Sequence, residues 1–228
     1  MRVRFLLVLL PVAALMVATA CASPEPAPVA SASEATQAQA PAADPTGPVT
    51  ATYNVVATGT EARYRVRETL ANRTLPNDAV GVTKEVTGSV AFTAEGLVVP
   101  SKSKITVGLK TLQSDRNQRD DTVRKTILQI PEFPTVTFVP KKVTGVQFPV
   151  PASGEADVQI TGDMTVMAVT REVTWAGKLT YGANQVSGKL TTLFQFPYFN
   201  MEKPSVAAVL SVTDDIKLEL DFTAAKAP

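Results

Sequence analysis

Hydrophobic and polar residues alternate with a period of two along most of the chain beyond residue 50. In residues 216–222, "IKLELDF", every second residue is apolar and the residues between them are charged. In residues 62–68, "ARYRVRE", Tyr64 and Val66 fall on one side of a strand and three arginines fall on the other. Alternation of this kind predicts β-strands that bury one face and expose the other. Further runs with the same pattern are residues 86–92, 103–109, 135–139, 172–179 and 186–196.

Short stretches rich in turn-forming residues separate the predicted strands, for example "TAEG" at residues 93–96, "FPVPASGEAD" at residues 148–157 and "TYGANQ" at residues 180–185. Several short strands, each with one apolar face, are typical of an antiparallel sandwich or a closed barrel. No repeat with a period of about 20–50 residues is visible, which argues against a propeller or a solenoid. We therefore expect an all-β domain.

One segment between two predicted strands breaks this pattern, because it is charged and compatible with a helix. Ser114 or Asp115 can cap a helix that runs over about residues 117–126. Val123 and Ile127 lie on one face of this helix, and two prolines then return the chain to an extended strand. A single amphipathic helix between strands either covers an open end of a barrel or forms an exposed connection, and both alternatives stay open.

The first 20 residues have the features of a secretory signal peptide. A short basic start precedes an uncharged apolar run over residues 5–18, and small residues follow it. This run is shorter than the roughly 20 apolar residues of a transmembrane helix, and Pro11 interrupts it. Cys21, the only cysteine, comes next and resembles the lipidated cysteine of a bacterial lipobox. We expect Cys21 to be acylated after cleavage; the alternative is an incidental free cysteine in an ordinary signal peptide.

Residues 21–50 would combine the lipid anchor with a tether made mainly of Ala, Pro, Ser, Thr and Gln. This composition contains too few large apolar side chains to offset the entropy of folding, so we expect disorder. Residues 51–226 are long enough for one domain with a single core. The formal net charge of +1 gives no reason to expect a nucleic-acid partner.

Residue types that support catalysis or metal binding are scarce in this domain. The chain contains no histidine, which removes the most common general base and metal ligand. No G-x-S-x-G motif occurs, and the acid pairs at residues 120–121 and 214–215 lack the spacing of a glycosidase site. We therefore expect neither an enzyme nor a metal site. The three arginines of residues 62–68 form either a solvated strand face or a phosphate-binding surface.

Aromatic residues are prominent on the apolar faces of the predicted strands. In a barrel of about eight strands they either fill the core or surround one slender apolar ligand. Composition alone does not distinguish these two cases. The residues concerned are Phe92, Phe138, Trp175, Phe194, Phe196, Phe199 and Phe222.

Four motifs occur in an order that resembles the YceI-like family of lipid- and polyisoprenoid-binding proteins. They are "KTLQSD" at residues 110–115, Arg119-Asp120, "FPTVTF" at residues 133–138 and "GDMTVMAVTREV" at residues 162–173. The resemblance extends over roughly residues 51–223. The chain departs from the family at Met167 and Ala168, where histidine and glycine are common, and in a longer excursion at residues 72–84.

The resemblance implies an extended, lipocalin-like antiparallel β-barrel of about eight strands with one short helical insertion. Its tunnel would take an isoprenoid or a similar apolar chain, with no other cofactor. The helix would lie near one end of the tunnel, where Arg116, Arg119 and Arg124 could meet an anionic head group. Alternatively, the Arg119–Asp120 pair only pins the helix to the barrel. The residues expected to contact the ligand are Tyr64, Phe92, Arg119, Asp120, Phe133, Phe138, Trp175, Phe194, Phe196 and Phe199.

Two functions follow from these features. The first is a non-enzymatic carrier or sequestering protein for an amphipathic lipid, polyisoprenoid or quinone-like, held at the extracytoplasmic face of a bacterial membrane by Cys21. The second is a surface-tethered structural or interaction module with a filled core and no ligand. An exposed edge strand would also permit a homodimer. A void surrounded by the inward aromatic residues distinguishes the first function from the second.

Overall fold

The computed structural model describes residues 43–71, 75–205 and 209–228 of the 228-residue chain. The expected signal peptide, Cys21 and most of the expected tether lie outside the described residues. Within the described part, no helix is both long enough and apolar enough to cross a membrane.

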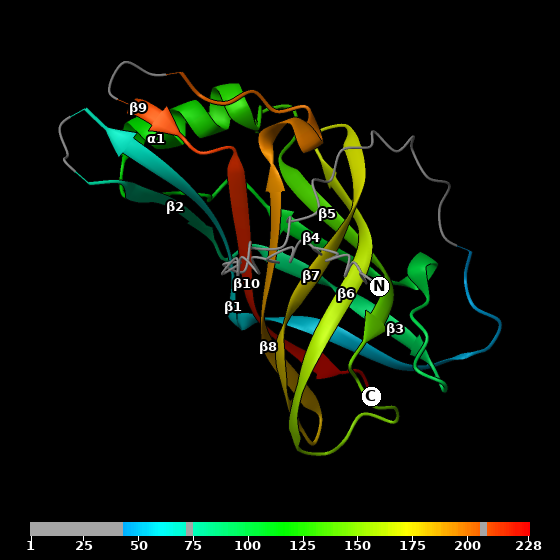
Figure 1. Ribbon diagram of the computed structural model, residues 1–228. Coiled ribbons are helices and arrows are strands. Elements are labelled where there is room, and N and C mark those ends of the chain that lie inside the picture. The colour runs from blue at the N-terminus through cyan, green and yellow to red at the C-terminus, as the bar shows by residue number, and fades with distance from the viewer. Residues whose placement is uncertain (1–42, 72–74, 206–208) are drawn as a thin grey trace, which may run out of the picture. The chain divides into compact units, whose positions relative to one another are not determined.

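In the described ranges, ten strands form one antiparallel sheet, and eight of them close into a barrel (Figure 1). Their order around the ring is β1, β3, β4, β5, β6, β7, β8 and β10, and the pairing of β10 with β1 closes it. The predicted barrel of about eight strands is therefore confirmed. The strands are β1 (Val49–Leu70), β2 (Asn77–Thr83), β3 (Val86–Thr93), β4 (Lys104–Gly108), β5 (Thr135–Thr144), β6 (Gly154–Val166), β7 (Val169–Gly182), β8 (Gln185–Gln195), β9 (Val209–Val212) and β10 (Asp215–Lys226).

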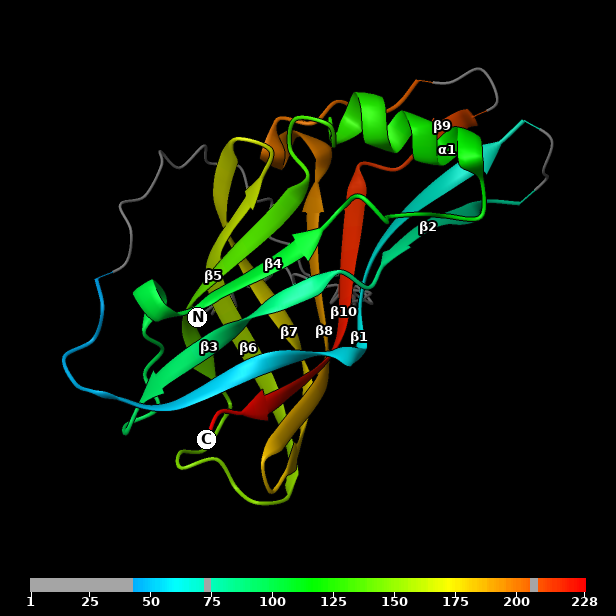
Figure 2. The same ribbon diagram turned by 180° about the vertical axis from the view of Figure 1, so that it is seen from behind.

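Strand β1 is 22 residues long and belongs both to the barrel and to a hairpin beyond it. Its first part pairs with β3, and its last part pairs with β2 on one side and β9 on the other. The register with β10 shifts between Val56 and Glu61, where Gly59 has a φ of +82°. The Thr60 hydroxyl donates to the Val56 carbonyl (2.6 Å) and accepts the Thr223 N–H (3.1 Å), which holds this bulge in the sheet. Figure 2 shows β1 bending and then continuing to the hairpin with β2.

The charged segment forms α1 (Asn117–Thr122), which continues as a π-helical turn over Val123–Ile127. This agrees with the predicted helix, but the predicted cap is wrong. Arg116 occupies the N-cap position without a side-chain cap bond, and the Asp120 carboxylate accepts the backbone N–H of Ser114 (2.8 Å). A side chain in the first turn thus reaches back to the residues before the helix. Two short 3-10 helices, η1 (Pro100–Lys102) and η3 (Phe196–Phe199), lie between strands.

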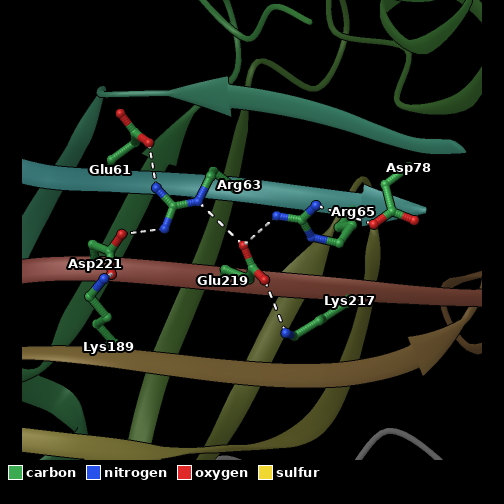
Figure 3. A network of polar contacts seen from close by, with 8 residues as sticks. All are labelled: Glu61, Arg63, Arg65, Asp78, Lys189, Lys217, Glu219 and Asp221. Atoms are coloured by element: carbon green, nitrogen blue, oxygen red, sulfur yellow. Dashed lines mark hydrogen bonds and ion pairs between the residues drawn. The ribbon is translucent and has the colours of Figure 1, made fainter. Parts of the chain in front are cut away.

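Charged side chains form a network on the outer face of β1 and β10 (Figure 3). The Arg63 Nε lies 3.3 Å from Glu219, and the terminal nitrogens of Arg63 contact Glu61 and Asp221. Arg65 also reaches Glu219, at 3.4 Å. The arginine face of β1 is therefore turned outward, and carboxylates on the neighbouring strand match its charge.

The network predicts a pH-dependent contribution to stability. Partial burial by itself raises the pKa of Glu219, but bonds from Lys217 and Arg65 outweigh it and lower the pKa from 4.5 to about 2. A carboxylate with a lowered folded-state pKa stabilises the fold above its unfolded-state pKa, and this stability is lost as the pH falls from about 4.5 toward 2. We expect Glu219→Gln to lower the free energy of unfolding at pH 7 by about 1–2 kcal/mol after solvent screening.

Urea unfolding at a series of pH values checks this prediction. The difference between wild type and Glu219→Gln should shrink as the pH falls through the same window. Glu132→Gln is the control, because Glu132 is exposed and forms no ion pair with the residues that the structure describes. A difference that stays constant down to pH 3 would contradict the assignment.

Candidate functional site

An apolar cavity of about 290 Å³ lies inside the barrel. Every strand of the ring contributes side chains to its wall, and the π-helical turn after α1 adds Val123 and Ile127. Residues such as Ile105, Val136 and Leu218 point inward but are only half-buried, because they border this void. The barrel is therefore hollow, which contradicts the alternative of a filled core. The volume is near the lower end of that found for small-molecule pockets.

Six of the ten expected ligand-contacting residues line this cavity. They come from six different elements, because each occupies an inward position of a strand or of η3. These residues are Tyr64, Phe92, Phe138, Trp175, Phe194 and Phe196.

The other four expected contacts lie elsewhere. Phe199 is fully buried behind the cavity wall, with its ring centroid 4.9 Å from that of Phe194. Phe133 is half-buried in the turn before β5 and does not border the cavity. Arg119 and Asp120 face the segment around α1 rather than the barrel interior.

Trp175 lies in the cavity wall between the α1 end of the cavity and the opposite end. It packs against the apolar cluster below α1 and also against the cluster at the opposite end. Its ring meets Phe138 edge to face, with a centroid distance of 6.3 Å. The position makes Trp175 an internal spectroscopic reporter of anything that enters the cavity.

The loop between β5 and β6, residues 145–153, lies at the end of the barrel farthest from α1 (Figure 1). Its residues Val146, Phe148 and Val150 line the cavity. The ring of Phe148 lies 5.0 Å from Phe92, and a Cβ at Gly96 would fall only 2.1 Å from it. The turn predicted over residues 148–157 gave no indication that this segment lines a cavity. The detectable signal was their spacing, since every second residue of the segment is apolar.

The other end of the cavity is covered by α1 and the π-helical turn, so the helix is not an exposed connection (Figure 1). Val123 packs with Leu109, Leu112 and Ile130 in a small apolar cluster under the helix. Burial of this cluster holds the helical segment on the barrel rim.

Arg119 pins α1 to β1. Its Nη2 donates to Glu68 Oε1 at 2.5 Å, and its Nη1 donates to Ser114 Oγ at 3.2 Å and contacts Asp115. The side chains of Arg119 and Glu68 are only 11% and 7% exposed, so this is a nearly buried ion pair. Arg124 is engaged as well, because its Nη2 donates to the Leu112 carbonyl at 2.7 Å.

A second cavity of about 110 Å³ adjoins the first at the α1 end. It lies among α1, β1, β2 and β9, and its wall includes Glu68, Arg116, Gln118 and Arg119. Five residues border both cavities, so only a thin partition separates them. They are Tyr64, Val66, Val123, Ile127 and Phe196.

Three polar atoms in the barrel are buried without a hydrogen-bond partner among the residues that the structure describes. They are Tyr64 OH, Trp175 Nε1 and Tyr181 OH, and all three side chains border the main cavity. Burial raises the pKa of the Tyr64 phenol to about 12, so it stays protonated at neutral pH. Buried polar groups normally find a partner, so the three atoms mark positions where a ligand could supply one. Among the described residues, no group of three or more acidic or cysteine side chains is placed so that it could hold a metal ion.

Comparison with known proteins is consistent with this architecture. The family model described as "YceI-like domain" matches residues 53–224. UPF0312 proteins from two strains of Pseudomonas putida, GB-1 and W619, are each 29% identical over 118 residues. These matches span 48% of this chain and 58% of each relative, so the chain spans less than two thirds of their length.

Two solved structures share the fold. One is a polyisoprenoid binding domain from Saccharophagus degradans implicated in plant cell wall breakdown, with a TM-score of 0.60 and 10% identity. The match covers 77% of this chain and 98% of that one. The other is Burkholderia cenocepacia BcnA, with a TM-score of 0.54 and 16% identity, covering 75% of this chain and 99% of that one.

Proposed function

Because this chain belongs to the YceI-like domain family, we propose that its barrel binds a lipid with a long apolar tail, such as a polyisoprenoid or a quinone-like molecule. The observation that carries the proposal is the hollow interior, whose wall is almost entirely aliphatic and aromatic. Burying an apolar tail there is favourable by about 25 cal/mol per Å² and requires no reactive side chain. The polyisoprenoid binding domain from S. degradans, which shares the fold, supports this ligand class.

The protein would carry or sequester its ligand rather than transform it. The side chains that border the cavity are suited to enclosing a hydrocarbon chain, and the charged residues nearby are engaged in ion pairs at α1 and on the outer face. A tunnel covered at both ends would shield a water-insoluble molecule during transfer between membranes or storage.

Trp175 provides the experiment, because it is the only tryptophan in the chain and lines the cavity. The full chain with Cys21→Ser, purified without detergent, would be titrated with prenyl alcohols of increasing length. We expect a saturable change in Trp175 emission at one lipid per barrel, with dissociation constants in the micromolar range or below. No saturable change with any length, together with an organic extract of the purified protein free of lipid, would refute the proposal.

We also propose that Cys21 is acylated and holds the barrel at the extracytoplasmic face of a bacterial membrane. The support is the short apolar run and the single cysteine directly after it. The wild-type chain expressed in a bacterium should partition into the detergent phase of Triton X-114, and Cys21→Ser should move to the aqueous phase. A wild-type chain found mainly in the aqueous phase would show that the anchor is absent.

A further inference from the structure

The two adjoining cavities differ in character. The main cavity is apolar, whereas Glu68, Arg116 and Arg119 border the smaller one beneath α1. Because five residues border both cavities, a ligand whose tail fills the main cavity can reach the smaller cavity with its polar end. The groups around the smaller cavity therefore select the head group.

The charged cluster around Tyr64 and the smaller cavity does not favour an anion. The single positive charge of Arg119 is met by two carboxylates, Glu68 and Asp115. Asp120 adds a third, buried carboxylate; it acts on the Tyr64 phenol, as Asp115 does, without bordering the cavity itself. Arg116, which borders the smaller cavity, adds a second positive charge. These three acids and two arginines sum to a charge of −1. An anionic head group that bound Arg119 would have to displace Glu68, which would leave a buried carboxylate unpaired.

Tyr64 lies on the partition between the two cavities. A Cβ at Gly81 would be 2.1 Å from Tyr64 Cε1, so the ring rests directly against the backbone of β2 and is held in place. Its hydroxyl is buried with no hydrogen-bond partner in the described part of the chain. The phenol is protonated at neutral pH and can donate to an oxygen on the ligand.

We infer that the ligand carries an uncharged, oxygen-bearing head group, such as a hydroxyl, carbonyl or ether, that sits beside Tyr64, and that phosphate or carboxylate head groups are selected against. The inference rests on the proposed lipid-binding function and narrows its ligand class. It departs from the expectation that the arginines around α1 meet an anionic head group, because the carboxylates of Glu68 and Asp115 pair with Arg119.

The test compares farnesol with farnesyl monophosphate by titration of Trp175 fluorescence in the full chain with Cys21→Ser. We expect farnesol to bind at least tenfold more tightly. Asp115→Asn removes one exposed carboxylate from the cluster. We expect it to reduce the ratio of the two dissociation constants, farnesyl monophosphate over farnesol, about threefold or more. Asp157→Asn removes the same charge from an exposed position at the opposite end of the barrel and should leave the preference unchanged.

A second pair of variants tests the hydrogen bond. Tyr64→Phe keeps the ring against Gly81 and should weaken farnesol binding about three- to tenfold, as expected for one lost hydrogen bond. Tyr198→Phe removes a hydroxyl that donates to the Glu172 carbonyl (2.7 Å) and borders neither cavity, so it should have no effect on farnesol binding. Thermal unfolding of both variants verifies that the barrel remains intact.

The outcomes separate the two proposals. Farnesyl monophosphate binding as tightly as farnesol would overturn the head-group inference alone and leave lipid binding standing. An equal effect of Asp115→Asn and Asp157→Asn, or no effect of Tyr64→Phe, would also overturn it. Failure of both probes to bind the wild-type barrel would overturn the proposed function and the inference together.

Discussion

Replacing Leu220 by tryptophan is expected to weaken the binding of prenyl alcohols roughly 50- to 100-fold while the barrel stays folded. Leu220 lies at the middle of β10 and lines the cavity, where it is half-buried. An indole at this position would exclude on the order of 100 Å² of lipid tail from the wall, which costs about 2.5 kcal/mol at ~25 cal/mol per Å². The stability of the unliganded barrel should stay equal or rise slightly, because the new side chain fills an existing void.

Leu193→Trp is the matched control for Leu220→Trp. Leu193 lies on the neighbouring strand β8 but faces outward and is 62% exposed. The same substitution there adds the same indole without entering the cavity, so binding should be unchanged. Native mass spectrometry with farnesol measures both variants without relying on tryptophan emission. Normal binding by a folded Leu220→Trp protein would show that the lipid lies outside the barrel.

The second large effect is expected at the ion pair under α1. Arg119→Met keeps much of the side-chain volume but leaves the carboxylate of Glu68 buried without its partner. Removing one member of a buried pair costs about 3 kcal/mol, which corresponds to a fall in Tm of roughly 6–12 °C for a domain of this size. Thermal unfolding monitored by circular dichroism measures this loss.

Lys125→Met on the same helical segment controls for the loss of a charge. Lys125 is 72% exposed and its pair with Asp121 is separated by 3.7 Å, so its removal should change stability by less than about 0.5 kcal/mol. The double variant Glu68→Met with Arg119→Met should recover most of the loss, because no unpaired charge remains. Equal effects of Arg119→Met and Lys125→Met would mean that the pair does not fix α1.

The strands could be predicted from the sequence because one buried face imposes a period of two on every strand, whereas the choice of a barrel over a sandwich came from the family resemblance. The same pattern placed Tyr64 and Val66 correctly on the inner face of β1. It could not reveal the cavity, because a half-filled interior and a solid one need the same alternation. Whether the inward side chains meet depends on the diameter of the ring, which is set by how the strands pair.

The candidate site could be predicted only in part from the alternating pattern. Glu68 follows Tyr64 and Val66 in the same alternating phase, which places a carboxylate on the inner side at the end of β1. Such a residue requires a cationic partner, but the sequence does not show that the partner is Arg119, which is 51 positions away. Phe148 could not be assigned to the site because the prolines that follow it predict a turn, and a turn prediction does not show that its apolar side chains fold back over a cavity.

The covers at the two ends of the barrel have a kinetic consequence. The ring is closed by hydrogen bonds on every side, so a lipid leaves only past α1 or past the loop that carries Phe148. The residence time is therefore governed by how often one of these covers opens, and it can be long even when equilibrium affinity is modest. The ion pair of Arg119 makes the α1 end the firmer of the two, so exchange should be fastest through the Phe148 loop.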